Sequence, residues 1–586
     1  MHHTGSGGIY QQTIKTKPNQ TKPNQLPSIG VHHKANFNIF LNKNKLKITQ
    51  TIRHSHTLLP IHPMDQEKFS DRVLINGTVV RVTLTADGKL QWTEGFQRTL
   101  TLEKEVLGFA VDSNQIKIRA VIEKENGICC GGSSGGLVRK DFVFEPLSQE
   151  SQRLWCQKLR EYLDSLGRPK RLFIFMNPFG GKKTASKIFL DNVKPLLEDA
   201  DIQFTLEETT RQLYAKDVAK RLDLSKYDGI VCVSGDGILV EVVNGLLERE
   251  DWSAAIKMPL GVIPAGFFPS YLILCIKFMA MNIFYILAMV TTIARGNWKF
   301  LLWTGTGNGM VKSLLDSVGE PCKASNATLA IIRGHKHSLD VATILQGETR
   351  FYSVLMLAWG LVADIDIESE KYRWMGSARI DFYALQRILR LRQYNGRVSF
   401  VPAPGFEDYG EPTSYNGESI NEKDVSNPSQ EQPIKARQYG YQGPAVSLEN
   451  LGWRTINGPF VSVWLHNVPW GGEDTMAAPD AKFSDGYLDL ILIRDCPKLD
   501  LLKLMTQLSN GGHIKSNYVQ YLKVKAFILE PGTCTHDPTR EGIIDSDGEV
   551  LARGKGTYLC DQKTLMAYDK LQITLDQGLA TLFSPV

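Results

Sequence analysis

The chain has 586 residues, of which 42% are apolar and 22% charged, proportions typical of folded proteins and not of disordered, collagen-like or polytopic membrane chains. At about 100 to 200 residues per domain, this length predicts three or four domains. The 67 Lys and Arg residues barely outnumber the 62 acidic residues, and the 9 cysteines form no CxxC pair. We therefore expect no nucleic-acid partner, no disulfide scaffold and no zinc site, and a reducing compartment.

Residues 1–63 are rich in Lys, Asn, Gln, Thr, His and Pro and contain the immediate repeat TKPNQTKPNQ. Because this composition offers too little apolar surface for a core, we predict that the segment is disordered. It lacks the apolar stretch and the cleavage site of a secretory leader. We expect Met64 to be the more natural start of the chain.

Residues 64–166 are predicted to form a small antiparallel β module. Short β-rich runs such as VLINGTVVRVTL and QIKIRAVIE are separated by NG, DG and Gly-Gly turns. The following stretch SQESQRLWCQKLREYLDSL has Trp155, Leu159 and Leu163 at helical spacing after a Ser-rich cap. Strands closed by one amphipathic helix are typical of a pleckstrin-homology-like module.

Residues 167–325 are predicted to be an α/β nucleotide-binding domain, because apolar strands such as RLFIFM, GIVCVS and GVIP alternate with helical stretches. From residue 326 to 586 short β runs dominate, beginning with ATLAIIRG. They predict a mainly antiparallel β-sandwich domain. Within it, residues 408–447 are polar and rich in Gly, Pro, Ser and Asn, which indicates a long disordered surface loop.

The first candidate site is the run NPFGGKKT at residues 177–184, at the end of the first α/β strand. Glycines let the backbone approach a phosphate, lysines and a helix N-terminus supply positive potential, and Asn177 can hold the turn. The spacing is not that of a Walker A loop. A Gly turn between a strand and a helix is also a common structural feature, so this run alone leaves phosphate binding open.

Two further Gly-rich turns follow, SGDG at residues 234–237 and GTGNG at residues 305–309. The carboxylate of Asp236, at a strand tip between glycines, can reach a phosphate-bound metal or a substrate hydroxyl. The alternative is a turn in which Asp236 only caps a helix. Three such loops in one domain favour a nucleotide site.

Together, NPFGGKK, SGDGILVEVVNGL, GVIPAG, TGNGM and LMLAWGLVADIDIESEKYRWMG resemble the diacylglycerol-kinase-type catalytic fold and, within it, the plant-type sphingosine kinases. The resemblance runs from about Asp71 to the C-terminus. It implies that a nucleotide lies between the α/β domain and the β-sandwich domain, that the lipid enters the second domain, and that Asp236 is the catalytic acid-base. It places the following residues around ATP: Asn177, Pro178, Phe179, Thr209, Ser234, Gly235, Glu241, Thr306, Gly307 and Asn308.

The run AWGLVADIDIESEKYRWMGSAR indicates the substrate. By the resemblance, Asp366 accepts the ammonium and hydroxyl of a long-chain base, Gly237 also contacts the lipid, and Arg373 and Arg379 hold the transferring phosphates. A partly buried carboxylate favours a cationic amine, and guanidinium groups suit phosphate oxygens. A neutral ceramide or diacylglycerol gains nothing from that charge. Taken alone, an Asp-rich run followed by Lys and Arg is more typical of a solvated face.

Near the C-terminus, IIDSDGEVLARG resembles the family's Asp-Gly-Glu segment, which implies that Asp547, Gly548 and Glu549 lie at the nucleotide. Mg²⁺ is then expected at Asp547 and, through water, at Asp236. An Asp-Gly turn in a hairpin is the alternative interpretation of this motif.

Residues 267–305 interrupt the resemblance between PAG and TGNGM, and removing them restores the motif in frame. Residues 271–294 are mostly apolar, carry only Lys277 as a charge and are long enough to span a membrane. Their position between a core strand and the phosphate loop favours a translated retained intron. A single transmembrane segment is the alternative.

We therefore predict a lipid kinase that uses ATP and Mg²⁺ to phosphorylate the primary hydroxyl of sphingoid long-chain bases, giving the 1-phosphate. The alternatives are a ceramide or diacylglycerol kinase on the same fold, or a lipid-binding form whose catalysis is impaired by the insertion. We expect a cytoplasmic protein that attaches peripherally to a membrane surface. Nothing in the sequence indicates an oligomeric state.

Overall fold

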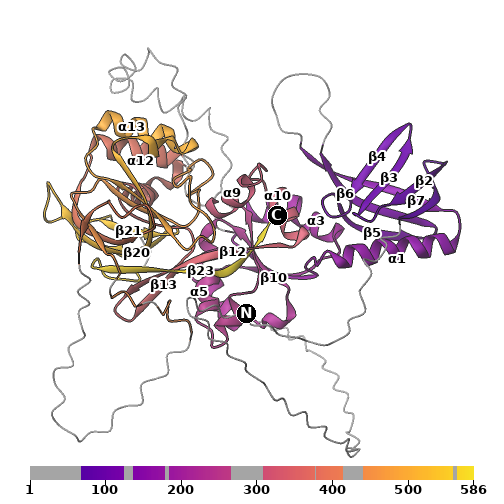
Figure 1. Ribbon diagram of the computed structural model, residues 1–586, viewed down its shortest axis with the longest axis horizontal. Coiled ribbons are helices and arrows are strands. Elements are labelled where there is room, and N and C mark those ends of the chain that lie inside the picture. The colour runs from indigo at the N-terminus through magenta and orange to yellow at the C-terminus, as the bar shows by residue number, and fades with distance from the viewer. Residues whose placement is uncertain are drawn as a thin grey trace, which may run out of the picture. The chain divides into compact units, whose positions relative to one another are not determined.

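Figure 1 shows the computed structural model. It describes residues 68–123, 136–178, 184–265, 308–375, 378–413, 440–445, 447–449, 451–558 and 564–586. The predicted disordered segment 1–63, the insertion at 267–305 with its candidate membrane span, and Phe179, Thr306 and Gly307 lie outside the described residues.

The first part of the described chain is an antiparallel sheet followed by helix α1 (Gln149–Ser165), both visible in Figure 1. The strands are β1 (Phe69–Ile75), β2 (Thr78–Leu84), β3 (Lys89–Glu94), β4 (Phe96–Thr101), β5 (Val106–Asp112), β6 (Gln115–Glu123) and β7 (Leu137–Pro146). They are arranged in the order β4-β3-β2-β1-β7-β6-β5. The helix begins where the Ser148 hydroxyl accepts a hydrogen bond from the Ser151 amide, and Trp155 and Leu159 on its inner face pack into the sheet's core. The predicted β module closed by one helix is confirmed.

The α/β part is built on a parallel sheet in the order β9-β8-β10-β11. Its strands are β8 (Arg171–Met176), β9 (Gln203–Glu208), β10 (Gly229–Ser234) and β11 (Leu260–Pro264). The helices are α2 (Ala185–Ile188), α3 (Lys194–Asp199), α4 (Tyr214–Arg221), α5 (Asp236–Leu247), α6 (Trp252–Ala255), α9 (Gly309–Asp316) and α10 (Ala324–Arg333), with a π-helical turn η1 (Phe189–Val193) and a 3-10 turn η2 (Leu224–Lys226). Strands β8, β10 and β11 are almost wholly buried, as continuous apolar runs require in a sheet covered on both faces.

Antiparallel strands dominate the second half. They are β12 (His335–Gln346), β13 (Thr349–Ser353), β14 (Met356–Gly360), β15 (Tyr394–Pro402), β16 (Glu411–Pro412), β17 (Arg454–Asn457), β18 (Ser462–His466), β19 (Leu488–Ile493), β20 (Val519–Cys534), β21 (Ile543–Ser546), β22 (Glu549–Arg553) and β23 (Leu571–Ser584). The helices are α11 (Leu361–Glu368), α12 (Ala378–Leu389) and α13 (Lys498–Gln507), with 3-10 turns η3 (Ser369–Met375), η4 (Leu508–Asn510) and η5 (Gly512–Lys515). The predicted mainly antiparallel second domain is confirmed.

Strand β23 joins the two halves. It pairs antiparallel with β12 and β20, and its Leu582 pairs with Leu260 of the parallel strand β11. One cluster of buried apolar side chains consequently continues from the parallel sheet into the antiparallel part. The ends of the parallel strands are thereby held at a fixed place beside the second half.

The segment ATLAIIRG was expected to begin the β-sandwich as a strand, and this expectation is wrong. It lies within helix α10, which ends at Gly334 with a left-handed φ of 79°. The helix packs on β11, and a Cβ on Gly261 would lie 2.8 Å from Ile331 Cδ1. A short apolar run does not distinguish a buried strand from a buried helix, and here the packing surface of the sheet decides.

The polar loop predicted at residues 408–447 is anchored at both ends. Strand β16 pairs with β17 near its start. Near its end Tyr441 is only 7% exposed, its ring centroid lies 4.6 Å from that of Trp252 and 5.6 Å from that of Tyr352, and its hydroxyl donates to Asp576. The prediction of a wholly disordered surface loop is therefore corrected at these two ends, since a buried aromatic side chain stabilises the second one.

Candidate active site

The carboxyl ends of the parallel strands bring several of the predicted nucleotide residues together. The Asn177 amide donates to Val233 O at 3.2 Å, and the Thr209 amide donates to Met176 O at 2.9 Å. Ser234 ends β10, and its carbonyl accepts a hydrogen bond from the Ala265 amide at 3.2 Å. Ligands bind at this edge of open α/β sheets, so the geometry agrees with a nucleotide site that includes Asn177, Thr209 and Ser234.

Asp236 lies between the N-terminal ends of two helices. It is in the first turn of α5, directly after Gly235, and its carboxylate accepts hydrogen bonds from the Gly309 amide at 2.7 Å and the Met310 amide at 3.2 Å at the start of α9. Burial raises the pKa of Asp236 to about 7 although both backbone hydrogen bonds lower it, and the nearby charges of Asp547 and Glu473 raise it further. A carboxyl group with this pKa is suited to proton transfer near neutral pH.

Glu241 is on the same helix but contacts a different element. Its two carboxylate oxygens accept hydrogen bonds from the Leu213 amide at 3.0 Å and the Ala215 amide at 2.9 Å. Leu213 has a left-handed φ of 63° directly before α4, so Glu241 satisfies backbone donors at a strained helix start. In this structure Glu241 therefore holds the position of α4.

Asp547 is enclosed by backbone donors. Its carboxylate accepts hydrogen bonds from the Val354, Leu355 and Met356 amides at 3.0, 2.9 and 2.7 Å. Its φ is 55°, and the following Gly548 also has a positive φ of 82°, as a tight Asp-Gly turn between β21 and β22 requires. Burial raises the pKa of Asp547 to about 6. The hairpin interpretation of this motif is thus realised, and Asp547 joins that turn to the β13–β14 connection.

Glu549 accepts fewer hydrogen bonds than Asp547. Its Oε2 accepts a hydrogen bond from Gln212 Nε2 at 2.6 Å, and a Cβ placed on Gly237 would lie 3.9 Å from its Oε1. Burial raises the pKa of Glu549 to about 7, and the charges of Glu241 and Asp547 add to the effect. Glu549 therefore lies above the start of α5, beside the catalytic candidate.

Asn308 precedes α9 and is 4% exposed. Its side-chain Nδ2 donates to Glu473 Oε1 at 2.7 Å, while its Oδ1 is buried without a hydrogen-bond partner among the described residues. Sequence reasoning missed Glu473, because it follows an isolated Gly-Gly pair far along the chain. Its only sequence signal is the run WGGED at residues 470–474.

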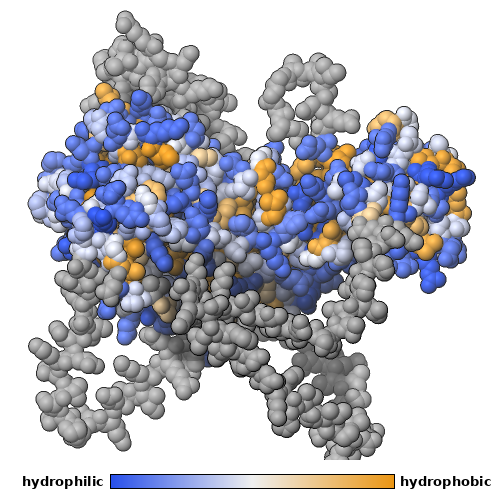
Figure 2. Space-filling model, in the orientation of Figure 1, coloured by the Kyte–Doolittle hydropathy of each residue, from blue (hydrophilic) through white to orange (hydrophobic). Residues whose placement is uncertain are grey.

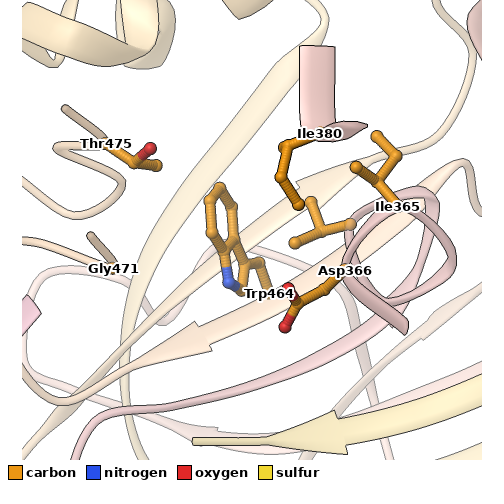
Figure 3. A pocket seen from close by; sticks show the side chains of 7 residues that line it. Ile365, Asp366, Ile380, Trp464, Gly471 and Thr475 are labelled. Atoms are coloured by element: carbon orange, nitrogen blue, oxygen red, sulfur yellow. The ribbon is translucent and has the colours of Figure 1, made fainter. Parts of the chain in front are cut away.

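A pocket in the second half contains Asp366. Its lining residues are Val362, Ile365, Asp366, Ile380, Trp464, Gly471 and Thr475. In Figure 3 the Asp366 carboxylate lies beside the Trp464 ring, Ile365 and Ile380 lie on one side, and Gly471 and Thr475 lie on the other. Asp366 is 7% exposed and Thr475 is 2% exposed, with no hydrogen-bond partner for the Thr475 hydroxyl among the described residues. The cavity is mostly apolar and contains one acidic group.

The pocket adjoins the Asp236 side of the site. A Cβ on Gly309, the first residue of α9, would lie 2.4 Å from Trp470 O and 3.1 Å from the carbonyl carbon of Gly471. The Trp470 amide also donates to the Ser313 hydroxyl of α9 at 3.1 Å. Only glycine permits this close approach, so the helix end that Asp236 caps is packed on the wall of the Asp366 pocket.

The structure describes the side chain of only one of the two arginines that were predicted to bind phosphate. The side chain of Arg373 lies outside the described residues. Arg379 makes a salt bridge with Glu370 at 3.0 Å, and no described contact brings it to Asp236. Its predicted role at the phosphates stays a prediction.

Neither a metal cluster nor a membrane span is evident in the part of the chain that the structure describes. Within the described ranges, no group of three or more His, Cys, Asp or Glu side chains is arranged to hold a metal ion. The helices among those residues are all too short or too polar to cross a membrane.

Comparisons with known protein families identify the class of enzyme to which this fold belongs. Residues 171–270 match the family described as "Diacylglycerol kinase catalytic domain", and residues 448–565 match the "YegS C-terminal NAD kinase beta sandwich-like domain". The protein therefore has the two-part architecture of diacylglycerol-kinase-type enzymes, as the fold also indicates.

The full-length relatives narrow this class to one family. The chain is 60% identical to "Sphingosine kinase 2" of Arabidopsis thaliana, with 88% of this chain and 96% of that protein covered. It is 29% identical to human "Sphingosine kinase 1" over 66% of this chain and 87% of that protein. It is 31% identical to human "Ceramide kinase" over 69% of this chain and 68% of that protein. The chain belongs to the sphingosine kinase family.

Proposed function

We propose that the protein is an ATP-dependent lipid kinase that phosphorylates the primary hydroxyl of sphingoid long-chain bases. The observation that carries the proposal is the packing of the Asp236-capped start of α9 on the wall of the Asp366 pocket. A nucleotide at the ends of β8, β10 and β11 and a lipid in the pocket would then meet at Asp236. Family membership and the two matched domains support the same activity.

Asp236 would take the proton from the lipid hydroxyl. Its pKa of about 7 keeps a large fraction of the carboxylate ionised at neutral pH while leaving it basic enough to accept a proton. Its two backbone hydrogen bonds to Gly309 and Met310 orient the carboxylate, so the acceptor oxygen is positioned before the lipid arrives. In this proposal the same carboxylate therefore builds the site and performs the proton transfer.

Asp366 would recognise the headgroup. It is the one ionisable side chain among the residues that line the described pocket. An ammonium group in this mostly apolar cavity gains a charge-assisted contact with Asp366, whereas a neutral amide or ester gains little. Ile365, Ile380 and Trp464 would pack against the first carbons of the alkyl chain.

The residues present fit Mg²⁺ better at Glu549 than at Asp547. Three backbone amides already occupy the Asp547 carboxylate, whereas Glu549 is partly exposed and accepts one side-chain hydrogen bond. When bound near Glu549, Mg²⁺ would offset the negative charge of the transferring phosphate. We therefore assign the direct contact to Glu549 and the positioning of the β21–β22 turn to Asp547.

Apolar side chains on the surface support a peripheral membrane location. Leu389 of α12 is 48% exposed and Leu499 of α13 is 75% exposed, and Figure 2 shows apolar surface over these helices. Helix α12 also carries Ile380, which lines the Asp366 pocket. A lipid bilayer at this surface would deliver a long-chain substrate near the pocket.

A ceramide kinase is the second candidate, because a human ceramide kinase covers a similar share of this chain. One assay separates the two: transfer of labelled phosphate from ATP to sphinganine, to a ceramide and to a diacylglycerol, each at equal concentration in mixed micelles. We expect the label in sphinganine. Preferential labelling of ceramide or diacylglycerol would refute the proposed substrate.

A further inference from the structure

Thr475 contributes a buried hydroxyl group to the wall of the Asp366 pocket. The residue is 2% exposed, and its Oγ1 has no hydrogen-bond partner among the described residues. In Figure 3 the Thr475 side chain points toward the Trp464 ring. Buried hydroxyl groups nearly always have a partner, so this one calls for a partner that the described wall does not supply.

The other side chains of the pocket wall have different hydrogen-bonding capacities from Thr475. An ionised Asp366 can only accept hydrogen bonds, and Trp464 already donates its Nε1–H to Met356 Sδ at 3.1 Å. The remaining lining residues carry no polar side-chain atom: Val362, Ile365, Ile380 and Gly471. Among the residues that line the described pocket, Thr475 is therefore the one uncharged side chain that can both donate and accept a hydrogen bond.

A tight turn fixes the position of Thr475. The Gly471 amide donates to Thr475 O at 2.9 Å, and Gly472 pairs with Thr475 across an isolated β-bridge. Within the same turn, Glu473 accepts the side-chain amide of Asn308 at 2.7 Å, which ties the turn to the start of α9. The Thr475 hydroxyl is thus held in place before a ligand arrives, and such preorganisation raises affinity.

We propose that the Thr475 hydroxyl binds the secondary hydroxyl next to the amine of a long-chain base, which makes Thr475 a specificity residue for 2-amino-1,3-diols. The secondary hydroxyl of the lipid can donate to the Asp366 carboxylate and accept from Thr475 at the same time. A site built to hydrogen-bond a substrate hydroxyl discriminates against an analogue that lacks it. The inference rests on the proposed function and adds to it the recognition of a second hydroxyl.

The test compares the binding of sphinganine with that of 2-aminooctadecan-1-ol, which keeps the ammonium and the primary hydroxyl but lacks the secondary one. Equilibrium dialysis of each labelled lipid, below its micelle-forming concentration, gives its Kd with the full chain. We expect wild type to bind sphinganine about tenfold more tightly, the effect of one buried hydrogen bond. Thr475→Val should raise the Kd for sphinganine about tenfold and change that for 2-aminooctadecan-1-ol less than about twofold, because valine keeps the shape and removes the hydroxyl.

Two further variants control for a merely structural role of Thr475. Thr475→Ser keeps the hydroxyl and should retain the wild-type ratio of the two Kd values. Thr328→Val removes a buried hydroxyl from helix α10, where Thr328 is 0% exposed and donates to Ala324 O at 2.7 Å. Thr328 does not line the described pocket, so this variant should change neither Kd.

The inference can fail while the proposed function stands. Equal Kd values for the two lipids in wild type would overturn it without any variant, even if Thr475→Val did not fold. An unchanged ratio of the two Kd values in a folded Thr475→Val or Thr475→Ala variant would overturn it as well. Preferential transfer of phosphate to a ceramide or a diacylglycerol would instead refute the proposed function.

Discussion

The carboxyl groups at the two ends of the proposed site have different surroundings. At the nucleotide end, Asp236 and Glu241 each accept two backbone amides, so these side chains position helices α9 and α4. At the lipid end, Asp366 lies among mostly apolar side chains that line a pocket. The first arrangement holds the starts of two helices in place, whereas the second places one acidic group at a cavity.

The largest expected effect is at the nucleotide end. Asp236→Asn should lower kcat by roughly a hundredfold to ten-thousandfold, the usual contribution of a general base, since the amide keeps the shape and loses the basicity. The measurement is phosphate transfer to sphinganine by a chain that lacks residues 267–305.

Asp340→Asn is the matched control for that variant. Asp340 is a buried carboxylate that also accepts two backbone amides, from Gly486 and Gly578 at 2.8 and 2.6 Å. It should lose stability and keep kcat. Retention of more than about a tenth of wild-type turnover by Asp236→Asn would count against the assigned base.

The second-largest expected effect is the gain in activity on deletion of residues 267–305. Their flanks are held at neighbouring points, because the Ala265 amide donates to Ser234 O and the Gly309 amide donates to Asp236. Deleting these residues should leave the fold intact and raise phosphate transfer by about a hundredfold, since misplacing a phosphate loop by about 1 Å costs that much. Equal specific activity of the two chains, both monodisperse without detergent, would show that the insertion is tolerated.

At the lipid end, Asp366→Asn should raise KM for sphinganine by about tenfold to a hundredfold and leave KM for ATP unchanged, because only the contact with the ammonium is lost. Asp364→Asn on the same helix is the control, since Asp364 pairs with Arg387 and Tyr394. Asp364→Asn should lower Tm but should not raise KM for sphinganine relative to KM for ATP. Unchanged lipid kinetics in Asp366→Asn would remove the basis for a sphingoid substrate.

The smallest effect is a pH dependence. A general base works when deprotonated, so kcat/KM should fall as the pH drops below the Asp236 pKa of about 7, by about tenfold per unit at the acid end. Glu549 has a similarly raised pKa of about 7, so the Glu549→Gln variant decides between them. The fall in kcat/KM at low pH should persist in the Glu549→Gln variant. Its disappearance would assign that pH dependence to Glu549.

The sequence predicted most of the fold and the positions of the main motifs. Alternating strands and helices, the Gly turns and the Asp236 strand tip depend on local pattern and are visible in the sequence. Helix α10 was misread as a strand because a short apolar run has no decisive period. Tyr441 was missed because its burial depends on Trp252 and Tyr352, which are far away in sequence.

Some of the proposed site residues could likewise be predicted from the sequence, and others could not. Asp236 and Asp366 belong to recognisable motifs. Glu473 does not, since its place in the site arises only from its contact with Asn308 across a long separation in the chain. The sequence also did not indicate that Asp547 would be enclosed by three backbone amides, because which peptide groups face a side chain is a property of the tertiary fold.

Phosphorylation of the primary hydroxyl is tested most directly by comparing sphinganine with 1-deoxysphinganine, which differs only in lacking that hydroxyl. The chain without residues 267–305 is incubated with labelled ATP and each lipid in turn. We expect label in sphinganine alone, with 1-deoxysphinganine acting as a competitive inhibitor because it keeps the ammonium that Asp366 is proposed to bind. Label in 1-deoxysphinganine, or no inhibition by it, would contradict phosphorylation of the primary hydroxyl at this headgroup site.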